Sequence, residues 1–167
     1  MPKSTKSLSG KNISIRELSK NETGILRDFL YEAIFIPVGV APPPRDIVDS
    51  AELRVYTDNF GQEAGDFALV AEVDGYVVGA VWVRIMNDYG HVDDDTPSLA
   101  ISLYKGYRGL GLGTKLMCGI LELLRQNGYR KVSLAVQKAN YALSLYQKTG
   151  FKIIGEHGEE YIMVCDL

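Results

Sequence analysis

The alternation of apolar and polar residues along the chain predicts both strands and helices. Two runs of strand character, residues 67–73 and 76–86, are separated only by an Asp-Gly pair, which favours a β-hairpin. Apolar residues recur at helical spacing over 112–124, and Gly128 ends this helix. Further strands are predicted at 13–18, 99–104, 132–136, 151–154 and 161–165.

Three more segments have helical character. Residues 22–36 carry apolar side chains at helical spacing, 46–60 form a less regular helical stretch, and 141–149 a short helix. Between the first two, residues 37–44 contain three consecutive prolines and must be irregular, so they could line a substrate entrance. The order of elements predicts an α+β fold around one mixed sheet.

The length and the ends of the chain indicate one domain. A chain of 167 residues that is 46% hydrophobic suits a single core over 13–167. Residues 1–12 are rich in Ser and Lys, which predicts a flexible tail and no signal peptide. The longest apolar run, 76–83, is too short to cross a bilayer. We expect a cytoplasmic protein without a membrane partner or metal site, with Cys118 and Cys165 as buried thiols.

The most informative segment is the glycine-rich turn of residues 108–113, which follows a predicted strand and opens a predicted helix. Glycines allow positive φ and leave no Cβ in the way, so successive N–H groups can converge on an anion. Leu112 stands where a nucleotide triphosphate loop needs lysine. A dinucleotide fingerprint fails too, because its third glycine and its downstream acid are missing.

The turn and its neighbours resemble the GNAT superfamily of N-acetyltransferases. Arg108, Gly111 and Gly113 satisfy the family pattern [RQ]-x-x-G-x-[GA]. About 30 residues downstream the family expects a strand, an Asn that opens a helix, a Tyr within it and a Gly-Phe pair. This sequence supplies them as residues 132–136, Asn140, Tyr146, Gly150 and Phe151. The resemblance is sharp from Ile101 to Phe151 and topological elsewhere.

The resemblance implies a fold and a reaction. In the fold, about four helices flank a mixed, mostly antiparallel sheet, in which two parallel strands, here 99–104 and 132–136, splay apart to admit acetyl-CoA. In the reaction, an acetyl group passes from acetyl-CoA to a primary amine by direct attack in a ternary complex. The amine would belong to a small cationic molecule or a peptide N-terminus.

The resemblance also assigns roles to residues. Backbone N–H groups of the turn would hold the pyrophosphate, and the backbone of Leu103 would align the thioester. Arg108 is more readily a packed loop residue than a phosphate ligand, and Asn140 would cap a helix and contact the pantetheine. Tyr146 would stabilise the leaving thiolate by a hydrogen bond. The cofactor-binding residues are thus Leu103, Arg108, Gly109, Leu110, Gly111, Leu112, Gly113, Thr114 and Asn140.

The general base is not assigned by any motif. Many relatives carry a Glu in the strand before the loop, but this chain has Ala100 and Ser102 there. A water relay to a distant carboxylate is equally open. The missing Glu also leaves a second class of function, a catalytically inactive acyl-CoA-binding sensor or regulatory module. Nearby candidates for a base are Glu72, His91, Asp93, Asp94 and Asp95.

The net charge of −3 conceals an asymmetry. Residues 46–95 contain twelve acids and two bases, whereas 96–155 contain nine bases and one acid. Such blocks suit a polyanionic cofactor and a cationic substrate, or they simply neutralise each other. The bases are scattered and not interleaved with aromatic residues, so no nucleic-acid partner is expected. A homodimer through the last strands is possible. An aromatic amine pocket could involve Tyr31, Phe35, Trp82 and Tyr89.

Overall fold

The apolar runs form seven strands and four α-helices within residues 7–167, the part of the chain that the computed structural model describes. The strands are β1 (Ile13–Glu17), β2 (Phe67–Val73), β3 (Tyr76–Arg84), β4 (Ser98–Leu103), β5 (Lys131–Gln137), β6 (Lys152–His157) and β7 (Glu160–Asp166). The α-helices are α1 (Leu26–Ala33), α2 (Ala51–Arg54), α3 (Leu112–Gln126) and α4 (Leu143–Lys148). The predicted α+β fold is confirmed.

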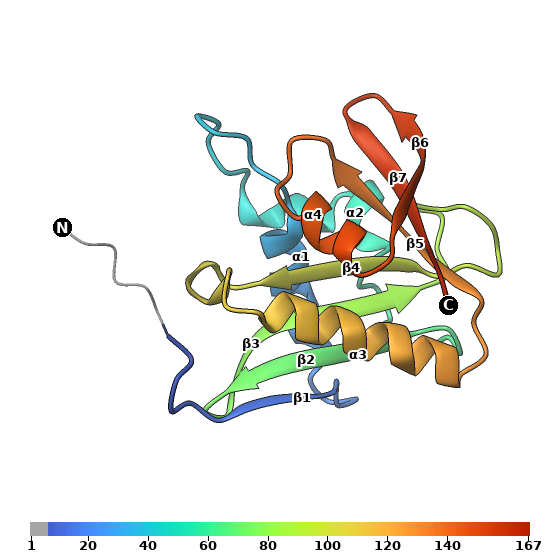
Figure 1. The fold of residues 1–167 in the computed structure, drawn as a ribbon. Coiled ribbons are helices and arrows are strands. Elements are labelled where there is room, and N and C mark those ends of the chain that lie inside the picture. Colours follow the sequence, from blue (N-terminus) through green and yellow to red (C-terminus); the bar gives the residue numbers. More distant parts are fainter. Residues whose placement is uncertain (1–6) are drawn as a thin grey trace.

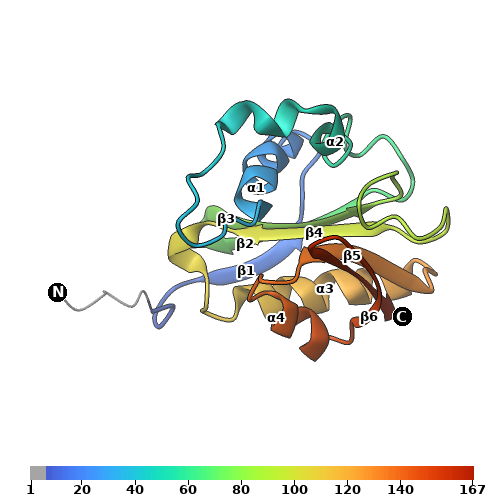
Figure 2. The ribbon, with the colours of Figure 1, turned by 90° about the horizontal axis from the view of Figure 1, so that it is seen from above.

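The strands make one sheet in the order β1-β2-β3-β4-β5-β7-β6. All neighbouring strands are antiparallel except β4 and β5, which are parallel. Helices α1 and α2 cover one face of the sheet, and α3 and α4 cover the other (Figure 2). The sheet therefore has one helical layer on each side.

The parallel strands β4 and β5 are paired only at Ser98 and Ser133, near their starts. Beyond this pair they diverge, as Figure 1 shows. The common end is fastened by Ser133, whose Oγ donates to the Gly90 carbonyl at 2.7 Å and lies 3.5 Å from the Ser98 Oγ. The predicted splayed pair is therefore confirmed, and its opening faces the end of β4 that leads into the glycine-rich turn.

The helices of the N-terminal part are shorter than predicted. The segment 22–36 begins with a 3₁₀ turn, and α1 ends at Ala33 because Ile34 is extended. The stretch 46–60 contains a 3₁₀ turn, the short α2 and irregular turns. Side chains of β3 donate hydrogen bonds to the backbone of this stretch. Its conformation therefore depends on these contacts, and its apolar spacing did not predict it.

Two apolar clusters make the core, one on each face of the sheet. The larger packs α3 against the sheet, and the smaller packs α1 against β2 and β3 around Trp82 and Phe29. Cys165 is buried in β7 as predicted, but the prediction for Cys118 is wrong, because this residue lies on the exposed side of α3. Cys118 is not among the residues that form the buried apolar face of α3.

Part of the predicted tail, residues 1–12, contacts the domain. Residues 1–6 of that tail lie outside the described residues. Leu8 packs against the larger core cluster, and the Asn12 N–H donates to the Asp74 carboxylate at 3.0 Å, so this part of the tail contacts the domain. In the described part of the chain, no helix has the length and apolarity needed to cross a membrane.

Candidate functional site

The glycine-rich turn uses its glycines in two ways. Gly109 and Gly111 have φ of 74° and 88°, values that residues with a side chain rarely adopt. Gly113 instead lies in the first turn of α3, where an added Cβ would stand 3.3 Å from the Leu145 side chain of α4. Two glycines shape the backbone of the turn, and the third lets α4 approach α3.

The backbone N–H groups of residues 109–114 are available for a ligand. Within the described chain, none of them donates to another residue. The first N–H groups of a helix have no partner inside it, and they carry the positive end of its dipole. Their position at the start of the 15-residue helix α3 fits the binding of an anionic phosphate.

A cleft of about 780 Å³ begins at this turn and extends to α4. Of the predicted cofactor residues, only Leu110 and Leu112 lie outside its lining, and Leu112 is fully buried in the core. The walls combine apolar side chains with three bases and one acid. The apolar residues include Ile101, Leu103, Ala142 and Leu145, and the charged ones are Lys105, Arg108, Lys148 and Glu32.

Arg108 is held by the protein itself. Its Nε donates to the Leu103 carbonyl at 2.9 Å, and its Nη2 donates to the Glu32 carboxylate at 3.1 Å. These contacts join the end of β4 to the end of α1 and leave Arg108 as a packed loop residue.

Tyr146 lies at the inner end of the cleft. The residue is 8% exposed, and no described residue hydrogen-bonds its hydroxyl. Burial, with a smaller contribution from Tyr141, raises the pKa of Tyr146 to about 12. Asn140 accepts the Ala142 N–H at 2.9 Å and so shapes the turn before α4. Both residues therefore have positions that a ligand in the cleft can reach.

A second, smaller pocket of about 250 Å³ lies beside α1 and α2. Ile101, Asn140 and Tyr146 line both cavities, so the two meet at the opening between β4 and β5. Most of the lining is apolar, and Glu160 is the one charged side chain among the described residues there. Its carboxylate accepts a hydrogen bond from Gln137 Nε2 at 3.1 Å. The other polar residues of the lining include Tyr56, Tyr89 and Gln137.

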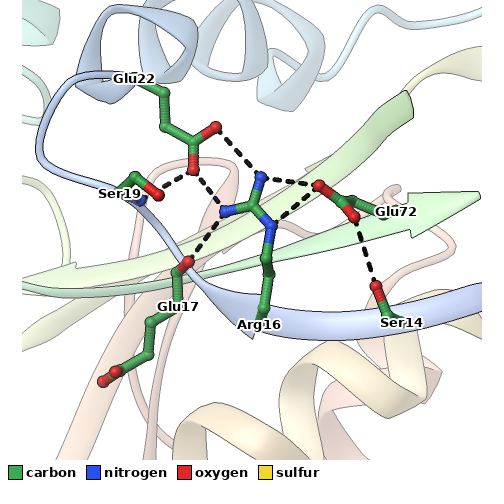
Figure 3. Close-up of polar contacts among 6 residues, drawn as sticks. All are labelled: Ser14, Arg16, Glu17, Ser19, Glu22 and Glu72. Atoms are coloured by element: carbon green, nitrogen blue, oxygen red, sulfur yellow. Dashed lines mark hydrogen bonds and ion pairs between the residues drawn. The ribbon is translucent and has the colours of Figure 1, made fainter. Parts of the chain in front are cut away.

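The five predicted base candidates lie away from both cavities. Within the described chain, none of them lines the cleft or the pocket. Figure 3 shows Glu72 paired with Arg16, whose Nε lies 2.8 Å from its carboxylate. His91 Nδ1 is 2.9 Å from the Met86 carbonyl, and its Nε2 faces the exposed Asp94 at 3.5 Å.

The remaining two candidates belong to the same loop. Asp93 accepts the Thr96 hydroxyl at 2.7 Å and pairs with Lys131, and these contacts lower its pKa to about 2. Asp95 is exposed, and its N–H donates to Asp93. These contacts join the loop to Thr96 and Lys131.

The four aromatic residues considered for an amine pocket lie in different places in the structure. Phe35 lines both cavities, Tyr31 lines the cleft, and Tyr89 lines the second pocket. Trp82 is fully buried, and its Nε1 donates to the Tyr56 carbonyl at 3.0 Å. The sequence reasoning missed Tyr56 and Glu160, since they come from distant segments and belong to no motif.

Comparison with known families decides what this arrangement is. The family model described as "Acetyltransferase (GNAT) family" matches residues 35–151, which include the glycine-rich turn, β4, β5 and Tyr146. The chain belongs to the GNAT family. The resemblance recognised in the sequence is confirmed.

Curated relatives of this GNAT protein are N-acetyltransferases. The probable N-acetyltransferase camello of Xenopus tropicalis is 40% identical over 86 residues, which cover 50% of this chain and 37% of that protein. N-alpha-acetyltransferase 50 of Danio rerio is 33% identical over 59% of this chain and 61% of its own length. The chain thus spans less than two thirds of either. An uncharacterized N-acetyltransferase of Mycobacterium bovis is 35% identical over 76% of this chain and 86% of its own length.

Solved GNAT structures share the fold. The PaiA N-acetyltransferase of Thermoplasma acidophilum, in complex with coenzyme A, has a TM-score of 0.70 and 20% identity, covering 93% of this chain and 99% of that one. The ribosomal-protein-S18-alanine N-acetyltransferase of Escherichia coli has a TM-score of 0.64 and 17% identity, covering 93% and 94%. At these identities the comparison speaks for the fold alone.

Acetyl-CoA is the acetyl donor of GNAT enzymes, and the cleft fits it. The unpartnered N–H groups of residues 109–114 suit its pyrophosphate. The apolar walls formed by Leu103, Ala142 and Leu145 suit its pantetheine arm, and Lys105 and Lys148 add positive charge. The cofactor prediction is confirmed for the family, and the residues of this chain are compatible with it.

Proposed function

We propose that this protein transfers the acetyl group of acetyl-CoA to a primary amine, of a small cationic molecule or a peptide N-terminus, by direct attack in a ternary complex. The observation that carries the proposal is the junction of the two cavities at Tyr146. A donor in the cleft and an acceptor in the pocket could meet there. Cys118 and Cys165 line neither cavity, so no thiol offers an acyl-enzyme route among the described residues.

The cofactor side of the site has two tasks. When bound, acetyl-CoA supplies a thioester whose carbonyl carbon is the electrophile. The N–H groups of the turn would hold its pyrophosphate, and the Tyr146 hydroxyl would hydrogen-bond the leaving sulfur. With a pKa of about 12, Tyr146 stays protonated at neutral pH. Full proton donation to a thiolate of pKa about 8.5 would cost about 5 kcal/mol, so Tyr146 acts as a hydrogen-bond donor.

The acceptor side favours a cation with an apolar body. Glu160 supplies a negative charge at the pocket, and the residues around it include Leu53, Leu99 and Val136. No Lys or Arg of the described chain lines this pocket. An ammonium group is attracted by this field, and its deprotonated form is the nucleophile that attack on a thioester requires.

Thiol release in the presence of an amine panel tests the proposed function. The assay uses a Cys118→Ser background, because the exposed Cys118 thiol would react with the detecting reagent. We expect release that depends on an amine. Coenzyme A binding without thiol release for any amine would instead indicate the inactive sensor.

Replacing Tyr146 tests its part in the reaction. We expect Tyr146→Phe to lower kcat about 100-fold, because the leaving sulfur loses its hydrogen bond, while the affinity for coenzyme A changes little. Tyr76→Phe is the matched control, since Tyr76 is exposed in the β2–β3 hairpin. Turnover unchanged in Tyr146→Phe would remove this residue from the mechanism.

A further inference from the structure

At Ala100, strand β4 has no carboxylate in the acceptor pocket. Ala100 lies on the same face of β4 as Ser98 and Ser102, since alternate residues of a strand share a face. This face is the one covered by α1, because the Ser102 hydroxyl donates to the Phe29 carbonyl at 2.6 Å. Ala100 lines the second pocket, so β4 itself offers no carboxylate to an amine there.

The carboxylate of Asp88 contacts Ser98, which precedes Ala100 on this face of β4. Its Oδ1 accepts the hydroxyl of the buried Ser98 at 2.7 Å. Same-face residues of a strand are about 7 Å apart, so this contact holds Asp88 close to the position of Ala100. The other oxygen, Oδ2, accepts the hydroxyl of Tyr56 at 2.7 Å. Both carboxylate oxygens are therefore held in place by hydroxyl groups.

Tyr56 connects Asp88 to the pocket. Tyr56 lines the pocket, and its carbonyl accepts Trp82 Nε1 at 3.0 Å. Trp82 on β3 is paired directly with Ala100 on β4, and directly paired residues present their side chains on the same face. The indole thus anchors Tyr56 beside the strand position that lacks a carboxylate.

The surroundings of this pair keep Tyr56 protonated. Burial, and then the charge and hydrogen bond of Asp88, raise the pKa of Tyr56 well above its usual value. Glu160 and Tyr89, which line the same pocket, act in the same direction. The His91 backbone N–H donates to the Asp88 carbonyl, and its ring faces Met86 and Asp94. Tyr56 can therefore pass a proton on but does not persist as a phenolate.

We propose that Tyr56 and Asp88 together take the proton from the acceptor ammonium, an inference that rests on the proposed function. One N–H bond of the ammonium breaks as its proton moves to Tyr56 Oη, and the Tyr56 hydroxyl proton moves to Asp88 Oδ2. The nitrogen keeps the electron pair with which it attacks the acetyl carbonyl. Asp88, which acts through Tyr56, then returns the proton to solvent.

The test compares two amines of similar size and different pKa in Asp88→Asn and Tyr56→Phe. One is the best alkylamine of the panel, with a pKa near 10.4, and the other its fluorinated analogue, which is largely neutral at pH 7. Less than about one part in 1000 of the alkylamine is neutral at pH 7. We expect kcat/KM at pH 7 to fall about 100-fold for the alkylamine and less than about threefold for the analogue. Raising the pH should restore the alkylamine rate.

The controls separate a proton relay from a structural role. Glu52→Gln neutralises an exposed carboxylate on α2, near Tyr56 in the chain, and should leave both amines unaffected. Coenzyme A affinity and thermal unfolding check that each variant is folded. If Asp88→Asn does not fold, Tyr56→Phe decides alone, because it leaves the Asp88–Ser98 contact intact.

Equal losses with both amines, or no loss with either, would overturn the relay. Either result would show that Tyr56 and Asp88 take no proton, and the proposed function would still stand. A wild-type protein that releases no thiol with any amine would overturn the proposed function, and the relay with it.

Discussion

Gly111 shows how one residue can be required for its backbone alone. Its φ of 88° lies in the left-handed region, and an added Cβ would meet no heavy atom within 4 Å. Space is therefore available for a side chain, and only the backbone conformation disfavours one. The same conformation turns the chain into α3, whose first residues Gly113 and Thr114 line the cleft.

Gly111→Ala should therefore destabilise the protein and weaken coenzyme A binding. A left-handed conformation costs a residue with a side chain about 1–2 kcal/mol, and relaxing it would turn the N–H groups away from the phosphate. Urea unfolding and calorimetric titration with coenzyme A measure the two effects. Gly155→Ala on β6 is the control, since Gly155 has open space and no positive φ. Equal changes in both variants would argue against a conformational cause.

At the scale of elements, β3 fixes the irregular segment that carries Tyr56. Arg84 Nη1 donates to the carbonyls of Val55 and Asp58 at 3.0 and 2.8 Å. Its Nε and Nη2 form two parallel hydrogen bonds with Asp66, whose side chain is completely buried. With the Trp82 indole, Arg84 holds this segment against the sheet, so the second pocket depends on contacts made by a strand outside its lining.

Breaking the Arg84–Asp66 pair should be costly. We expect Asp66→Asn to lower the free energy of unfolding by about 3–5 kcal/mol, because it leaves the Arg84 charge buried without its partner. Arg54→Met removes one side of the exposed Arg54–Asp58 pair and should cost less than about 1 kcal/mol. Urea unfolding compares the two. A similar small loss in both would mean that water reaches Arg84.

A second polar cluster ties β1 to β2 and to the 3₁₀ turn before α1. Arg16 pairs with Glu22 and Glu72 together (Figure 3). The hydrogen bond from Arg16, followed by that from the Ser19 N–H, lowers the pKa of Glu22 from 4.5 to about 2. Glu72, one of the base candidates predicted from the sequence, joins these elements through Arg16.

This cluster predicts a pH dependence of stability. Since the pKa of Glu22 is lower in the folded protein, its contribution is complete above pH 4.5 and is lost as the pH falls toward 2. Glu22→Gln should therefore be less stable than wild type at neutral pH, and the difference should shrink over this range. Thermal unfolding across pH measures it, with Glu17→Gln as the exposed control. A difference independent of pH would contradict the ion pair as its cause.

At the scale of the whole molecule, the features that could be predicted from the sequence are those formed by residues near one another in the chain. The Asp-Gly turn predicted the hairpin, and the motif from Arg108 to Tyr146 predicted residues that line one cleft. The second pocket depends on the pairing of Trp82 with Ala100, and Tyr56 and Asp88 come to it from separate segments. Such long-range register leaves no spacing signal, and Cys118 shows that even a helix position can be assigned to the wrong face.

The charge asymmetry of the chain is partly explained by the two cavities. Bases from the second charge block, including Lys105 and Lys148, line the donor cleft. Among the described ion pairs, Asp93–Lys131 is the one that joins the acidic stretch 46–95 to the basic stretch 96–155. Direct neutralisation between the two blocks is therefore slight, which leaves their fields available to ligands.

The single pairing of Ser98 with Ser133 has a mechanical consequence. The sheet is in effect two smaller sheets, β1–β4 and β5–β7, fastened at one end, and α3 packs along β1–β4. A donor lying between β4 and β5 fills the place where a continuous sheet would have its next backbone contacts. The two halves would then be joined in the middle through the bound donor and at one end through the Ser98–Ser133 pair.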